Sequence, residues 1–258
     1  MIFAILGAIV VGLSLGVFGS GGSILTVPVL VYLLGHEDKI AIAESLGIVG
    51  AIALVGSIPY AIDKLVEWRL VIFFGVPGMA GTFAGAWISG FVPGEVQLLV
   101  FGGVMVLAAT RMWQRARAVD RPDDIRRDAA IPAAAVRGVG VGLLTGFVGV
   151  GGGFLIVPAL VLLGGLSMRR AVATSLVIIA MNALVGLAKH RVVLTGAGQD
   201  THWDVMLVFI AVGIVGSLAG RAIQGRLDQR ALQTGFAGFL ALMSLFILIR
   251  ESVALFGA

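Results

Sequence analysis

A glycine-rich phrase occurs twice in this chain, each time inside apolar sequence. The stretch GVFGSGGSILTVPVL begins at Gly16, and GFVGVGGGFLIVPAL begins at Gly146. When residues 12–35 are paired with the residues 130 positions later, 13 of the 24 pairs are identical. With an offset of 135, Trp68 also pairs with Trp203. Self-similarity of this kind indicates two copies of one structural module.

The repeat divides the chain into three parts. We predict an N-terminal module over residues 1–112, a basic cytoplasmic linker over 113–130 and a C-terminal module over 131–258. The linker belongs to the one long hydrophilic run, RMWQRARAVDRPDDIRRDAAIP. A basic run between apolar segments is typical of a cytoplasmic loop beside anionic lipid, so we expect no nucleic-acid partner.

Long segments almost without charge predict a multi-pass protein of the cell inner membrane. Only 12% of the residues are charged, against roughly 25% in a soluble domain. The first segment lacks a basic start, which argues against a cleaved signal peptide. The segment 192–199 is short and has polar residues on both sides, so we expect a loop there. The predicted spans, apart from the glycine phrases, are residues 1–18, 41–62, 70–93, 96–110, 171–188, 205–219 and 231–249.

The distribution of lysine and arginine favours one topology over another. If each module crosses the membrane an odd number of times, the copies are inverted, and 14 basic residues lie inside against 4 outside. If each crosses four times, the copies are parallel and the numbers are 12 and 6. Because basic residues favour the cytoplasmic side, we predict an all-α integral membrane protein of two inverted-topology repeats, each with a broken or half-helix hairpin and three spanning helices. Both chain ends then face the exterior, and inverted repeats are a common plan of secondary transporters.

We call residues 19–23 and 149–153 the first and second glycine segments. The apolar run after each is about half as long as the hydrocarbon core is thick, so each predicts a half-helix that begins near the midplane. Pro28 and Pro158 fit best in or just after a first helical turn, and Ser23 is expected to cap the first half-helix. A helix start has unpaired N–H groups and a partial positive charge. Two such starts would form a binding site for a small anion.

Glycines can also serve close helix packing, and this alternative remains open for several of them. We expect packing for Gly12 and Gly16, and for the glycines of residues 78–85 and 213–220. The two glycine segments are too dense for a packing face and would break a helix. For these segments we favour the binding interpretation.

Polar residues on the following helices extend the predicted site. Ser45 pairs with Ser175 in the repeat, and Glu44 pairs with Thr174. Hydroxyl groups in a membrane need partners, although each could bond back to its own helix. Glu44 could carry a coupling proton, but it lies near the end of a span and we expect a solvated carboxylate. The predicted substrate-binding residues are Gly19, Ser20, Gly21, Gly22, Ser23, Ser45, Gly149, Gly151, Gly152, Gly153, Thr174, Ser175 and Asn182.

Other chemistries find little support in the sequence. The three histidines fall in predicted loops, and His190 and His202 with Asp200 and Asp204 match no familiar metal-ligand spacing. Disulfides and thiolate metal sites are excluded because the chain has no cysteine. A phosphate-binding loop and a metalloprotease motif are also absent. We therefore expect neither an enzyme nor a cofactor. Trp68 and Trp203 begin matching spans and fit interface anchors.

The two phrases GSGGSILTVPVL and GVGGGFLIVPAL, each followed by an A-x-A-x-S-L helix start, resemble the sulfite exporter TauE/SafE family of bacterial membrane proteins. The resemblance covers essentially the whole chain. It implies transport of sulfite, sulfonates or related organosulfur anions across the cytoplasmic membrane. The second copy lacks the equivalents of Ser23 and Glu44, so roles of these residues cannot be assumed for both halves.

Together these observations predict a secondary transporter that works by alternating access, with export as the expected direction. An anion channel and a membrane-embedded enzyme or assembly factor using the same pocket remain alternatives. The expected partners are a small anion and the lipid bilayer. A homodimer that associates through a face of small residues is compatible with the sequence, but no motif specifies the oligomeric state.

Overall fold

The computed structural model describes residues 2–36, 38–89, 91–92, 94–117, 131–148, 153–197 and 202–256. Every regular element in these ranges is helical, which confirms the predicted all-α class. Four helical stretches of the described residues are long and apolar enough to cross a membrane, namely 44–62, 68–88, 203–226 and 229–249. Shorter apolar helices cover 4–18, 21–31, 132–147 and 153–162.

The first half of the chain contains a broken helix followed by long ones. The helix α1 (Ile2–Phe18) ends before the first glycine segment, and the short α2 (Gly21–Pro28) begins within it. A wider π-helical stretch, η1 (Val29–Leu33), continues α2. Two long helices follow in the chain, α3 (Asp38–Ile62) and α6 (Gly94–Arg117). Between them in the sequence come α4 (Trp68–Leu70), a π-helical turn η2 (Val71–Gly75) and α5 (Val76–Ser89).

The second half follows the same order. It contains α7 (Ile131–Val148), the short α8 (Gly153–Leu162), α9 (Met168–Ala197), α10 (Trp203–Arg226) and α11 (Gln229–Phe256). Trp68 and Trp203 begin α4 and α10, as expected for matching spans. The prediction of a loop at residues 192–199 is wrong for residues 192–197, because α9 continues to Ala197. Pro158 lies just after the first turn of α8, as expected, whereas Pro28 is the last residue of α2.

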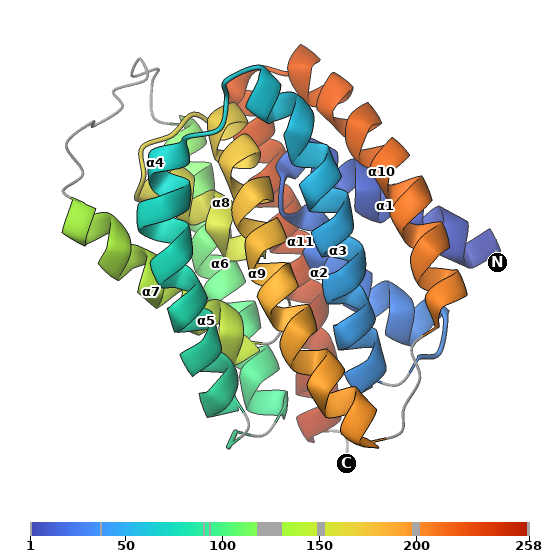
Figure 1. Ribbon diagram of the computed structural model, residues 1–258. Coiled ribbons are helices and arrows are strands. Elements are labelled where there is room, and N and C mark those ends of the chain that lie inside the picture. The colour runs from blue at the N-terminus through green and yellow to red at the C-terminus, as the bar shows by residue number, and fades with distance from the viewer. Residues whose placement is uncertain are drawn as a thin grey trace.

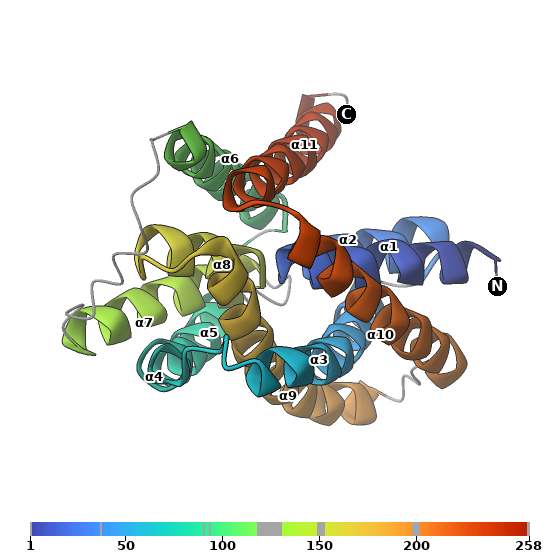
Figure 2. The same ribbon diagram turned by 90° about the horizontal axis from the view of Figure 1, so that it is seen from above.

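The helices pair across the two halves. Helix α1 packs against α10, α7 against α5, α3 against α9 and α6 against α11. Figure 2 shows α6 and α11 on one side and α3 and α9 on the other, with α2 and α8 between them. The short broken helices therefore occupy the interior of the bundle, and α8 is buried along almost its whole length.

Close packing explains the glycines of the long helices. A β-carbon on Gly12 would stand 2.8 Å from the Cα of Gly213, and one on Gly142 would stand 2.9 Å from the Cα of Gly78. Real side chains cannot approach this closely, so the backbones of α1 and α10, and of α7 and α5, touch only because these residues are glycine. The packing interpretation of these glycines is confirmed.

Candidate functional site

The first glycine segment interrupts the helix in the interior of the bundle. Gly19 has φ +76°, a left-handed conformation that favours glycine. Ser20 is fully buried and occupies the N-cap position of α2, where its side chain makes no capping hydrogen bond. The predicted break, and the predicted start of a half-helix after it, are confirmed.

The serine at position 23 has a different role from the one expected. Its hydroxyl donates a hydrogen bond of 2.8 Å to the carbonyl oxygen of Ser20. It therefore cannot cap the helix as predicted, because Ser23 already lies in the first turn of α2 and its hydroxyl is directed back to the residue before the helix. The first-turn amides of α2 receive no side-chain cap from the N-cap residue.

Two buried hydroxyl groups near this helix start have no partner in the described part of the chain. These are the side chains of Ser14 and Ser20. Ser14 is on α1 directly beside Gly21, so close that a β-carbon on Gly21 would collide with its hydroxyl oxygen. An unpaired buried hydroxyl costs free energy of about 1–3 kcal/mol. The start of α2 is thus lined by donors that a ligand could satisfy.

The second half-helix begins against the first. Of the second glycine segment only Gly153 is described, and Gly149, Gly151 and Gly152 lie outside the described residues. Gly153 is buried at the first residue of α8, and a β-carbon there would stand 2.7 Å from the hydroxyl oxygen of Ser23. The starts of α2 and α8 therefore lie against each other, and the side chain of Ile179 from α9 also packs against Gly153.

Residues of α9 approach the site unequally. A β-carbon on Gly19 would stand 2.8 Å from the hydroxyl oxygen of Ser175, which donates to the carbonyl oxygen of Val172. Thr174 is directed elsewhere, because its hydroxyl accepts a hydrogen bond of 3.0 Å from the backbone amide of Glu67. Asn182 is buried with an unpaired side-chain oxygen, but seven residues of helix place it about 10 Å beyond Ser175.

Ser45 belongs to the other long central helix, α3. Its side chain is buried, and its part in a binding site stays a prediction. It lies in the second turn of α3, near the end of that helix where Glu44 also lies. The structure thus brings Gly19, Ser23, Gly153 and Ser175 together. The other predicted residues lie away from this group, Ser45 on α3 and Thr174 and Asn182 on α9.

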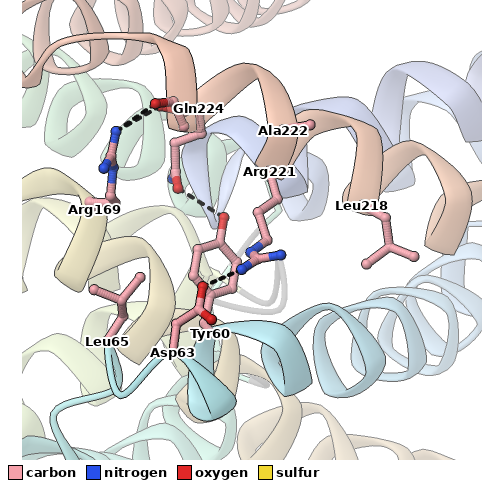
Figure 3. A pocket seen from close by; sticks show the side chains of 9 residues that line it. Tyr60, Asp63, Leu65, Arg169, Leu218, Arg221, Ala222 and Gln224 are labelled. Carbon is pink, nitrogen blue, oxygen red and sulfur yellow. Dashed lines mark hydrogen bonds and ion pairs between the residues drawn. The ribbon is translucent and has the colours of Figure 1, made fainter.

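A cavity of about 240 Å³ opens beside the end of α1 (Figure 3). The hydroxyl of Tyr60 donates to Gln224 Oε1 at 2.9 Å and lies 3.2 Å from the carbonyl oxygen of Gly16. Gln224 Nε2 donates to the carbonyl oxygen of Val17 at 3.0 Å. The cavity therefore adjoins the last turn of α1, directly before the first glycine segment.

Two arginines and one aspartate line this cavity. Arg221 forms an ion pair with Asp63, and its guanidinium lies over the ring of Tyr60. Arg169 donates to the carbonyl oxygen of Gly225 at 2.9 Å, an acceptor without formal charge. The sequence analysis did not predict this cavity. Its one signal there is Gln224, a polar residue inside the apolar helix α10.

We call this end of the bundle the arginine end, defined by Asp63, Glu67, Arg169, Arg170 and Arg221. Arg170 pairs with Glu67 at 3.2 Å, as Arg221 does with Asp63. These contacts place basic residues of α9 and α10 on the same side as the turn after α3, as the model with odd numbers of crossings requires.

At the opposite end of α3, Glu44 is fully buried and contacts two histidines. Its Oε2 lies 2.6 Å from Nδ1 of His36, and its Oε1 lies 3.1 Å from Nδ1 of His202. The backbone amide of His202 also donates to Oε1 at 2.8 Å. The expectation of a solvated carboxylate is wrong, because the turn after η1 and the start of α10 fold over Glu44. We call His36, Glu44 and His202 the histidine end.

The expected loop positions are confirmed for His36 and His202, whereas the loop expected at His190 is wrong because this residue lies in α9. His36 is almost buried, with a side chain 9% exposed, whereas that of His202 is 51% exposed. Of the group His190, His202, Asp200 and Asp204 considered from the sequence, Asp200 and the side chain of His190 lie outside the described residues. The role of Glu44 in proton coupling stays a prediction.

Comparisons with known proteins find similar membrane proteins. The family model "Sulfite exporter TauE/SafE" matches residues 4–247. A "Probable membrane transporter protein" of Xylella fastidiosa (strain 9a5c) is 30% identical over 253 residues, covering 95% of this chain and 94% of the relative. The "Probable membrane transporter protein YunE" of Bacillus subtilis is 27% identical, covering 90% and 92%. No solved structure is significantly similar to this chain.

Proposed function

Since this chain belongs to the sulfite exporter TauE/SafE family of membrane transporters, which are not enzymes, we propose that it moves a small sulfur-containing anion across the cytoplasmic membrane. Sulfite, a sulfonate or a related organosulfur anion is the proposed substrate, and export is the proposed direction. The transporter class follows from the family; the anion and the mechanism are argued below from the described residues.

The observation that carries the proposal is the meeting of two helix starts inside the bundle. Gly153 at the start of α8 lies against Ser23 in the first turn of α2. Each helix start carries a partial positive charge and unpaired amides. The unpaired hydroxyls of Ser14 and Ser20 add donors beside α2. A small oxyanion would accept hydrogen bonds from all of these groups without needing a buried arginine.

We propose that the two halves are inverted repeats around this site. The helix pairs support this, because exchanging the halves converts the α1–α10 pair into the α7–α5 pair and leaves α2–α8, α3–α9 and α6–α11 unchanged. The contact between Gly12 and Gly213 likewise becomes the contact between Gly142 and Gly78.

The ends of α3 and α10 suggest how access could alternate. Glu44 contacts His202 at one end, and Asp63 contacts Arg221 at the other. The two contacts are 19 residues apart on each helix (63 − 44 and 221 − 202), which is about 28 Å of helix and close to the thickness of the hydrocarbon core. Breaking one contact while the other holds would open the central site to one side only. The arginine-end cavity would then guide the anion between the cytoplasm and the glycine segments.

Purified protein in liposomes tests the proposal. We expect saturable flux of radiolabelled sulfite or a small alkanesulfonate, stimulated by the unlabelled anion on the opposite side. Ser20→Ala should reduce this flux, whereas Ser244→Ala should not, because the Ser244 hydroxyl is also buried but donates to its own helix. Ohmic flux without saturation would favour a channel, and the absence of flux for every sulfur anion tested would reject the proposed substrate class.

A further inference from the structure

We propose that His36, Glu44 and His202 form a binding site for one divalent transition-metal ion of the zinc type. The three ligand atoms, one from each side chain, all lie within 4.8 Å of one another. The two imidazole rings are 4.4 Å apart between centroids. This inference concerns the histidine end alone and does not depend on which solute the protein transports.

The donor set decides the class of metal. Two imidazole nitrogens and one carboxylate oxygen are the ligands of open zinc sites, in which water takes the fourth position. Ca²⁺ and Mg²⁺ prefer sites made only of oxygen ligands. The nitrogen donors therefore select Zn²⁺, Co²⁺, Ni²⁺ or another borderline ion. Both histidines present Nδ1 to Glu44, so both could turn the same nitrogen to a metal with little movement.

The surroundings of Glu44 suit a ligand that is held in place before the metal arrives. The carboxylate is fully buried, which is costly for a charge without partners. The backbone amide of His202 donates to Oε1 and fixes the carboxylate orientation. Such outer hydrogen bonds position metal ligands in known sites. Oε2 lies 2.6 Å from Nδ1 of His36, and a bound ion would replace this direct contact by taking one ligand atom from each side chain.

A route to the site is also present. His202 is half exposed, whereas His36 is almost buried and Glu44 is fully buried. An ion could therefore be captured first by His202 and then enclosed by the other two ligands. The bound metal would join the segment before α3, α3 itself and the start of α10. Of its ligands, Glu44 and His202 are 158 residues apart in the chain.

The experiment uses the full-length protein with a tag that contains no histidine, stripped of metal and then titrated with Co²⁺. We expect one Co²⁺ per chain, visible by the absorption of a four-coordinate site and displaced by Zn²⁺. His36→Ala and His202→Ala should each weaken binding at least about 100-fold. Asp204→Asn is the matched control, because Asp204 is an exposed carboxylate two residues from His202 and outside the cluster.

Thermal unfolding without metal separates loss of the site from loss of the fold. His202→Ala keeps the backbone amide that holds Glu44, so this variant should unfold at the wild-type temperature without metal. Added Zn²⁺ should raise the unfolding temperature of the wild type and of Asp204→Asn, but not that of His202→Ala. The proposal is overturned if folded His202→Ala binds Co²⁺ as tightly as the wild type, or if the wild type binds none.

Discussion

The hydroxyl oxygen of Ser23 lies 2.7 Å from the point where a β-carbon on Gly153 would stand. This relationship joins the two broken helices at the centre of the bundle, although the residues belong to different halves of the chain. It also means that the smallest possible side chain at position 153 would meet a polar atom. The interior between α2 and α8 therefore depends on glycine at this position.

Gly153→Ala should impair transport because the new methyl group would displace Ser23. We expect flux at least about fivefold slower, since overpacking of this kind costs about 1–3 kcal/mol and about 1.4 kcal/mol corresponds to a tenfold change in rate. Ser23→Ala removes the colliding oxygen, so the double variant should recover part of the loss. Flux measurements in liposomes check this, with equal protein insertion as the control. Equal flux in Gly153→Ala and the wild type would contradict the described contact.

Gly12→Val should destabilise the protein itself rather than the site. Its side chain would force α1 away from α10, where the Cα of Gly213 is 2.8 Å from the added carbon. We expect a loss of at least about 2 kcal/mol, measured as a lower unfolding temperature in detergent. Gly140→Ala on α7 is the control, because no atom lies within 4 Å of its added carbon. That change should be neutral or slightly stabilising.

Tyr60→Phe should weaken the contact between α3 and α10 at the arginine end. It leaves the buried Gln224 Oε1 without its hydroxyl donor, at a cost of about 1–3 kcal/mol. Gln224→Leu should cost a similar amount, and the double variant should cost less than the sum. Urea or thermal unfolding of the four proteins measures this coupling. Strict additivity would show that the hydrogen bond contributes nothing.

Arg169→Gln should reduce the apparent affinity for the anion more than the maximal rate. The side chain contributes a positive charge to the cavity that is paired with carbonyl oxygens rather than a carboxylate. We expect KM to rise by roughly threefold to tenfold at low salt, with a smaller effect at high salt. Arg117→Gln, at the exposed end of α6, removes the same charge away from the cavity and should leave KM unchanged.

Joining the arginine end covalently should stop transport. The chain has no cysteine, so Asp63→Cys with Arg221→Cys introduces a single reactive pair at positions that contact each other. A bifunctional thiol reagent should abolish flux in this variant if the ends of α3 and α10 separate during each cycle. The two single-cysteine variants treated alike are the controls. Undiminished flux in the cross-linked protein would contradict the opening of this end.

Much of the helical architecture could be predicted from the sequence because it depends on local patterns. The scarcity of charge predicted the apolar spans, and the dense glycines of residues 19–23 predicted the break between α1 and α2. The extent of α9 was underestimated, since His190 and Arg191 suggested the end of a span. A helix satisfies its backbone groups internally and can continue into water, so polarity alone did not mark its end.

The two polar ends could not be predicted in the same way. Glu44 was expected to be solvated because it lies one turn inside a span, and its burial depends on His202, which is 158 residues away. Tyr60 and Gln224 are 164 residues apart. No local pattern reports which residues of distant helices meet, and such contacts become visible only when the helices are packed.

The pairing of α1 with α10, drawn side by side in Figure 1, has a consequence for biosynthesis. Between the end of α1 and the start of α10 the ribosome must add 185 residues (203 − 18). At about 5–20 residues per second this takes roughly 10–40 s. During that interval the glycine-lined face of α1 has no partner helix, so lipid or an insertion chaperone must cover it until the last quarter of the chain is translated.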